Sequence, residues 1–146
     1  MKISIIILAL ALLPFTGCEK ASNTPKGCVV AFIIALEQHD MSKAWGLLGK
    51  DAQAFYNELG ERQRRSGKGA LENEVKKIKS FRSAAKDYSV RHDKGNDDNV
   101  KIVFYGGNEF IITTMNEDGD YKIKDANSVK TLMTIIAAEM DKGNGY

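Results

Sequence analysis

Side chains that carry nucleophilic or metal chemistry are scarce in this sequence, which has two cysteines, Cys18 and Cys28, and two histidines, His39 and His92. Protein metal sites use several His, Cys or carboxylate ligands at short spacings. The two histidines lie far apart and no cysteine motif accompanies them, so we expect no metal and no cofactor. The sequence also lacks a Gly-x-Ser-x-Gly elbow, a phosphate loop and a dinucleotide fingerprint. The two thiols are therefore the first candidates for chemistry.

Cys18 follows a pattern typical of export signals. Met1-Lys2 supplies a positive start, Ile3–Leu13 is an apolar run, and Pro14 interrupts that run. The tetrapeptide Phe15-Thr16-Gly17-Cys18 resembles the lipobox of bacterial lipoproteins, with phenylalanine where leucine is usual. The resemblance implies that residues 1–17 are a signal peptide and that Cys18 becomes an N-terminus carrying acyl chains such as palmitate. The alternative is ordinary secretory cleavage without lipid.

Several acyl chains on one cysteine anchor a protein stably, so we expect residues 18–23 to be the lipidated cysteine and a short tether at a bacterial envelope membrane. By resemblance to Gram-negative lipoproteins, which usually need aspartate after the cysteine for inner-membrane retention, Glu19 favours the outer membrane, facing the periplasm. Cys28 lies at helical spacing from Phe32 and Ala35, which predicts an inert thiol in the core and no disulfide.

Aromatic and titratable side chains at helix or strand spacing are candidates for a ligand pocket. The inner positions of the predicted strands hold three side chains that could exchange protons, Tyr88, His92 and Tyr121. The competing interpretation is that the large aromatic side chains fill the core and that His92, beside Asp93-Lys94, is solvated. The possible pocket residues are Phe32, Trp45, Phe55, Tyr88, His92, Phe104, Phe110 and Tyr121.

Positive charge is concentrated between Glu61 and Lys86, where nine basic residues stand against three acidic ones. Such a segment is either a solvated surface or a patch that faces an anionic lipid, a glycan or an acidic protein. Nucleic acid is not an expected partner, because the chain carries an export signal and the segment offers only Phe81 for stacking. The residues of this possible patch, called the basic segment below, are Arg62, Arg64, Arg65, Lys68, Lys76, Lys77, Lys79 and Arg82.

The elements that must position these side chains are helices in the first half of the chain. Apolar residues recur at helical spacing after Thr24-Pro25, a pair typical of a helix start. A third helix is expected to be capped by Asp51, and a fourth, basic helix follows Ser66–Gly69. The predicted helices are Pro25–Gln38, Met41–Leu48, Ala52–Arg64 and a fourth marked by Leu71, Val75, Ile78 and Ala85.

From Asp87 onward the apolar period changes from 3.6 to 2, which indicates strands. Asn127 or Ser128 should then cap a final helix that carries Val129, Leu132, Met133, Ile136 and Met140. Helices followed by strands predict a single α+β domain over 24–141, with an antiparallel sheet, a C-terminal helix and a flexible tail at 142–146. The predicted strands are Tyr88–His92, Val100–Tyr105, Glu109–Met115 and Asp120–Lys124.

Four stretches are similar to small lipoproteins of the nuclear-transport-factor-2-like superfamily: Thr24-Pro25, Val30–Glu37, His39–Leu48 and Gly119–Asp125. The resemblance implies a cone, in which N-terminal helices pack on a curved antiparallel sheet. This fold hosts enzymes and pure binding modules, so it specifies no chemistry. Two hypotheses follow. The first is a membrane-anchored, non-enzymatic domain that binds a ligand or partner; the alternative is a small enzyme that acts on an apolar molecule inside the cone.

Overall fold

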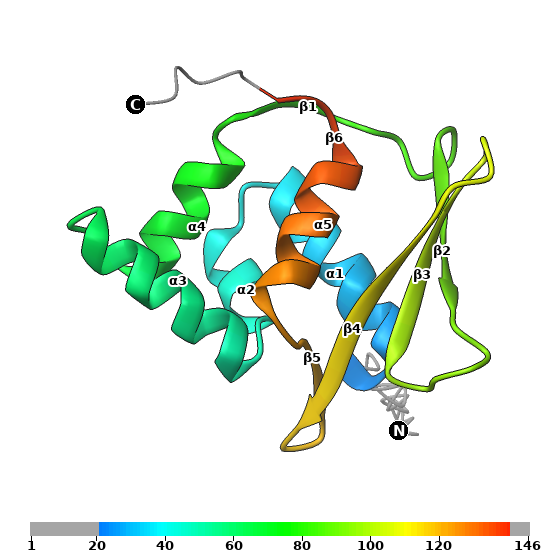
Figure 1. Cartoon of the computed structure of the whole chain (residues 1–146), viewed down its shortest axis with the longest axis horizontal. Helices are drawn as coiled ribbons and strands as arrows, with labels where there is room; N and C mark the ends of the chain where they lie inside the picture. Colours follow the sequence, from blue (N-terminus) through cyan, green and yellow to red (C-terminus); the bar gives the residue numbers. More distant parts are fainter. Residues whose placement is uncertain (1–20, 141–146) are drawn as a thin grey trace, which may run out of the picture.

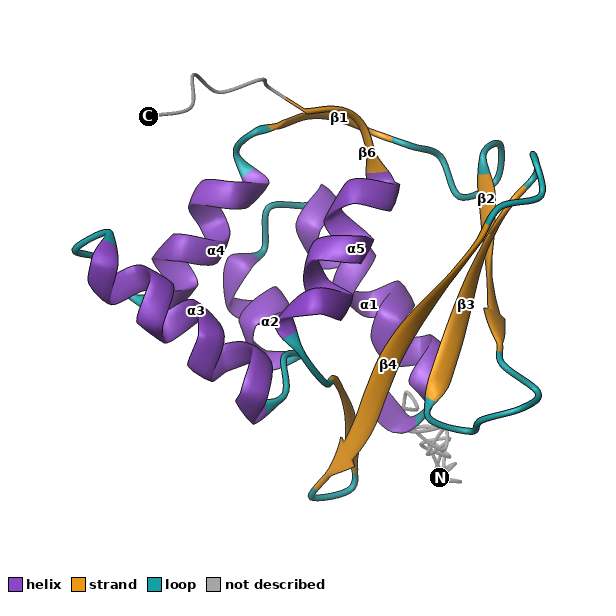
Figure 2. Ribbon diagram, viewed as in Figure 1, coloured by secondary structure: helices purple, strands orange, loops and turns teal. Residues whose placement is uncertain are grey.

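A computed structural model of the chain describes residues 21–140, in which helices pack against one side of a curled antiparallel sheet (Figure 1). Figure 2 shows the two layers separately coloured, with the helices gathered on one side and the long strands on the other. The α+β class and the order of helices, sheet and C-terminal helix are confirmed. The predicted signal peptide, Cys18 and the tail 142–146 lie outside the described residues.

The first long helix, α1 (Pro25–Glu37), begins where the sequence predicts. Thr24 is its N-cap, and the Thr24 hydroxyl accepts a hydrogen bond from the backbone N–H of Gly27 at 3.0 Å. Pro25 stands in the first turn, where its missing N–H costs no helical hydrogen bond. The side chain of Cys28 is fully buried on this helix, as expected.

Two predicted helix boundaries are wrong because distant residues decide them. Helix α2 is Met41–Gly46, shorter than predicted, since Leu48 instead bridges Ile123. Helix α3 (Lys50–Arg62) has Gly49 as its N-cap, and Asp51 lies inside its first turn. The backbone N–H of Lys50 donates to the Glu117 carboxylate at 3.0 Å. A side chain 67 positions along the chain thus satisfies the start of the helix.

The four predicted strands form one antiparallel sheet in the order β2-β3-β4-β5. Their bounds are β2 Tyr88–His92, β3 Asn99–Phe104, β4 Glu109–Glu117 and β5 Asp120–Ile123. Cross-strand pairs such as Val90 with Ile102 and Ile102 with Phe110 place alternate residues on one face. That face is turned toward the helices (Figure 1).

The predicted fourth helix ends earlier than expected, which is a correction. Helix α4 is Gly67–Val75, and the next residues form strand β1 (Ile78–Phe81), paired with strand β6 (Ala137–Met140). Ala85 is exposed and belongs to neither element. Residues that could continue a helix are extended here because antiparallel pairing with the end of the described chain satisfies their backbone groups.

The C-terminal helix α5 (Ala126–Ile136) is corrected in the same way. Its N-cap is Asp125, whose carboxylate accepts from the backbone N–H of Ser128 at 2.8 Å, instead of Asn127 or Ser128. Met140, predicted to lie in this helix, is at the end of β6 and 41% exposed. The helix therefore stops where the chain enters the two-stranded pairing.

The core lies between the inner face of the sheet and the helices. On α1, Val29, Phe32 and Leu36 are fully buried, and α1 crosses the inner face of the four strands (Figure 1). From the sheet, Ile102 and Ile112 are also fully buried. The centre of the curved sheet is thus occupied by the protein's own side chains, and any ligand space lies toward its edge.

Candidate functional site

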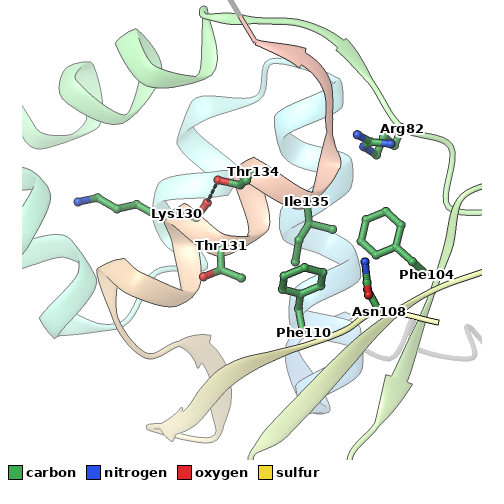
Figure 3. A pocket seen from close by; sticks show the side chains of 8 residues that line it. All are labelled: Arg82, Phe104, Asn108, Phe110, Lys130, Thr131, Thr134 and Ile135. Carbon is green, nitrogen blue, oxygen red and sulfur yellow. Dashed lines mark hydrogen bonds between the residues drawn. The ribbon is translucent and has the colours of Figure 1, made fainter. Parts of the chain in front are cut away.

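A pocket of about 570 Å³ opens between helix α5 and the turn end of the β3–β4 hairpin. Its volume is within the range of small-molecule sites. Figure 3 shows the side chains converging from three places: α5, the hairpin and the segment after β1. The lining residues are Arg82, Phe104, Asn108, Phe110, Lys130, Thr131, Thr134 and Ile135.

Two phenyl rings form the apolar wall on the hairpin side. Phe104 ends β3 and Phe110 lies on the neighbouring strand β4, with ring centroids 5.8 Å apart and planes at 74°. Edge-to-face packing of this kind is favourable and keeps both rings in defined orientations. Phe110 is 38% exposed, so an aromatic face remains open at the pocket. Ile135 faces the rings from α5 (Figure 3).

Arg82 supplies the cation of the site. Its backbone N–H donates to Ile136 O at 2.7 Å and its Nε donates to Ala137 O at 3.2 Å, so both are tied to the end of α5. The guanidinium carbon lies 5.8 Å from the centre of the Phe104 ring. Within residues 21–140 no carboxylate pairs with this side chain. The terminal N–H groups of the guanidinium are therefore unengaged by any acidic side chain of that range.

Lys130 is a lining residue whose charge is directed away from the pocket (Figure 3). Its ammonium lies 4.3 Å from the ring centre of Phe55, and Figure 3 shows it directed away from Phe104 and Phe110. The hydroxyl of Thr134 donates to Lys130 O at 2.9 Å. The helix thus contributes mainly neutral surface, with the Thr131 side chain as its polar part.

Phe104 and Phe110 are the predicted pocket residues that line this site. Phe32 and Tyr88 are fully buried in the core, as the competing interpretation had it. The remaining predicted residues do not line the pocket: Trp45, Phe55 and Tyr121 are partly buried against the core, and His92 is exposed.

Tyr88 and His92, two of the groups considered for proton transfer, do not come together in a site. Tyr88 is fully buried beside Phe104, with ring centroids 5.8 Å apart, and burial raises its pKa to about 12. Its hydroxyl has no hydrogen-bond partner among the described residues. His92 stands exposed at the end of β2. Neither lines the pocket.

The Cys28 thiol is held in its neutral form. Burial raises its pKa to about 12, outweighing the opposing effect of Lys122. Only the thiolate is a strong nucleophile. A reactive role for Cys28 in the native protein at neutral pH has no support from this environment.

The basic segment does not form one compact patch. Three arginines lie at the turn between α3 and α4: Arg62, Arg64 and Arg65. Two lysines, Lys76 and Lys77, follow the other end of α4, which is nine residues and roughly 14 Å long. Except for the partly buried Arg82 of the pocket, all residues of the segment are exposed. Lys76 pairs with Glu72 at 2.8 Å.

Sequence reasoning missed Arg82 as a pocket residue, along with Asn108, Lys130, Thr131, Thr134 and Ile135. The sequence groups Arg82 with its basic neighbours, because nothing local distinguishes it from them. A usable signal was present in α5, where Thr131, Thr134 and Ile135 share one side at i, i+3 and i+4 spacing.

Comparisons with family models, curated proteins and solved structures gave no significant match to this chain. Over residues 21–140 no three His, Cys, Asp or Glu side chains gather into a group that could hold a metal ion. In the same range, no helix is both long and apolar enough to cross a bilayer.

Proposed function

We propose that this chain is a bacterial envelope lipoprotein, lipidated on Cys18, whose α+β domain binds a small ligand without chemical turnover. The anchor is supported by the signal pattern of residues 1–17 and by the Phe15-Thr16-Gly17-Cys18 tetrapeptide. The binding function rests on one observation, the pocket between α5 and the β3–β4 hairpin. It combines an open aromatic wall with a cation that has no acidic partner in the described range, which is the usual chemistry of a recognition site.

The proposal of binding over turnover follows from the lining. The titratable lining residues are Arg82 and Lys130; a guanidinium keeps its proton in proteins, and the ammonium of Lys130 lies over the Phe55 ring, 4.3 Å from its centre. The exposed His92 and the buried Tyr88 lie outside the lining. No specific observation favours the enzyme alternative.

Two further assignments belong to the proposal. Glu19 after the lipidated cysteine favours the outer membrane, with the domain in the periplasm. Helices packed on a curved antiparallel sheet support a relationship to the nuclear-transport-factor-2-like superfamily.

The anchor is tested by labelling cells with radioactive palmitate. We expect Cys18→Ser to abolish incorporation of label into the protein, because the acylated thiol is gone. Cys28→Ser is the matched control and should incorporate label at the wild-type level, since its thiol is fully buried in α1. Equal labelling of the Cys18 variant, or an unlabelled wild-type protein, would contradict the lipoprotein assignment.

A further inference from the structure

We propose that the pocket takes a small amphipathic monocarboxylate, with the carboxylate on the guanidinium of Arg82 and the apolar part between Phe104, Phe110 and Ile135. This inference rests on the proposed binding function and specifies the ligand of that same site. The ligand must present one anionic end and an aromatic or branched apolar body of a size that fits about 570 Å³.

The anionic end of the ligand is inferred from the surroundings of the Arg82 side chain. The side chain is partly buried, fixed through Nε to Ala137 O, and without a carboxylate partner among the described residues. A guanidinium presents paired N–H groups that match the two oxygens of a carboxylate. Because the Nε bond holds the guanidinium in place, little side-chain freedom is lost when such an anion binds.

The apolar part of the ligand is inferred from the aromatic and aliphatic side chains of the pocket wall. The rings of Phe104 and Phe110 are locked edge to face, and Ile135 closes the space from α5 (Figure 3). Phe110 lines the pocket and is 38% exposed, so it offers apolar area that a ligand would cover. An apolar body next to these rings gains stabilisation that a purely ionic ligand would not.

A single negative charge fits better than several. Lys130 directs its ammonium toward Phe55, 4.3 Å from that ring centre, so Arg82 is the one lining cation whose charge faces the rings of Phe104 and Phe110 in Figure 3. The other polar lining groups, Asn108 and Thr131, are neutral. Polyanions such as nucleotides need several cations or a phosphate-binding loop, and this lining offers neither.

The test uses two probes that share one ring system, 2-naphthylacetate and its neutral amide, 2-naphthylacetamide. Each is titrated into the full lipidated chain in lipid nanodiscs, and binding is followed by the methyl NMR signal of Ile135. Wild-type protein should bind the carboxylate roughly 10- to 100-fold more tightly than the amide, the range expected for a charged hydrogen-bonded contact.

Three variants separate the two ends of the site. Arg82→Gln should remove the preference for the carboxylate while leaving amide binding within about twofold, because the neutral amide does not use the charge of Arg82 and the apolar wall is retained. Arg91→Gln, at an exposed arginine on β2 outside the pocket, is the matched control and should change neither affinity. Phe110→Ala should weaken both probes by a similar factor of roughly 10, because it removes the shared apolar contact.

The outcomes distinguish the inference from the function beneath it. Equal affinity of wild-type protein for both probes overturns the carboxylate inference and leaves the binding function standing. Failure of both probes to shift the Ile135 signal counts against the binding function itself. If Arg82→Gln does not fold, as judged by its methyl spectrum without ligand, Arg82→Lys replaces it; that variant keeps the charge but loses the two-pronged geometry, and should retain only part of the preference.

Discussion

Two buried tyrosines differ in the hydrogen bonding of their hydroxyls. Tyr56 on α3 and Tyr88 on β2 are both fully buried. The Tyr56 hydroxyl donates to the Glu74 carboxylate at 2.9 Å, whereas the Tyr88 hydroxyl has no partner in the described part of the chain. Burial raises the pKa of both phenols, and the adjacent Glu74 raises that of Tyr56 further. Both hydroxyls are therefore neutral at physiological pH, and the bond to Glu74 is the main difference.

We expect Tyr56→Phe to lower the free energy of unfolding by about 1–2 kcal/mol, because a hydrogen bond to a charged carboxylate is lost. Tyr88→Phe should leave stability within about 0.5 kcal/mol of wild type or raise it, since it removes a buried hydroxyl that makes no bond. Urea denaturation followed by the fluorescence of Trp45 measures both. Equal losses in the two variants would show that the Tyr88 hydroxyl has a partner.

At the scale of elements, two helices end on a left-handed residue that is not glycine. After α3, Arg64 has φ 55°, its backbone N–H donates to Glu61 O at 3.1 Å, and the N–H of Arg65 donates to Gly60 O at 2.9 Å. These two bonds define a Schellman motif, whose left-handed position favours glycine. After α1, His39 occupies the same position, also at φ 55°.

Arg64→Gly should therefore raise the free energy of unfolding by about 0.5–1 kcal/mol, because glycine adopts this conformation without a Cβ clash. Arg62→Gly is the matched control, since it removes the same charge from the last helical residue of α3. In a helical conformation glycine costs about 0.5–1 kcal/mol, so this variant should be destabilised. Thermal denaturation of both variants checks the opposite signs, and a loss of stability in Arg64→Gly would contradict the argument.

At the scale of the whole molecule, two turns rich in acidic residues lie beside the start of the described chain, and the part of the basic segment around β1 lies at the other end (Figure 1). The described chain starts at η1 (Ala21–Asn23), and the acidic β2–β3 and β4–β5 turns lie at that same lower edge in Figure 1. Strand β1 lies at the other end of α1, a helix of 13 residues and roughly 20 Å. The Phe81 ring of β1 contacts the ring of His39, which follows the C-terminal end of that helix. The acidic residues of the lower edge are Asp93, Asp97, Asp98, Glu117, Asp118 and Asp120.

In a protein anchored through Cys18, this placement turns the part of the basic segment around β1 away from the anchoring membrane (Figure 1). We expect the full lipidated chain in zwitterionic vesicles to cluster with added anionic vesicles at low salt and to release them at high salt, since exposed charges are screened. Light scattering measures the clustering. Replacing Arg65, Lys68 and Lys77 by Glu should abolish it without unfolding the protein, because exposed charges contribute little to stability.

The charge-matched control for this experiment reverses Lys26, Arg91 and Lys94, which are exposed and lie outside the basic segment. It produces the same change in net charge and should leave clustering intact. If the control loses clustering equally, net charge and not the basic segment is responsible. If wild-type protein does not cluster at low salt, an anionic lipid partner beyond the anchoring membrane is excluded, and an acidic protein or glycan stands as the proposed partner.

The start of the first helix and the strands of the main sheet were predictable from the sequence. The start of α1 at Thr24-Pro25 and the strand Tyr88–His92 were confirmed, because capping and side-chain periodicity are local properties. The antiparallel sheet, and with it the α+β class, follows from the alternation of residues from Tyr88 to Ile123. Of the pocket, only Phe104 and Phe110 could be named in this way.

Pairings between distant segments were decided by the tertiary structure alone. Residues 78–81 could have continued a helix, and they became β1 because Ala137–Met140 offers antiparallel backbone partners more than fifty positions away. The same pairing ends α5 and brings Arg82 to Ile136 and Ala137. The sequence alone therefore determined the start of α1, the four strands of the main sheet and the signal pattern. The position of Arg82 beside Phe104 depends instead on hydrogen bonds to Ile136 and Ala137, in a segment that no local pattern connects to it.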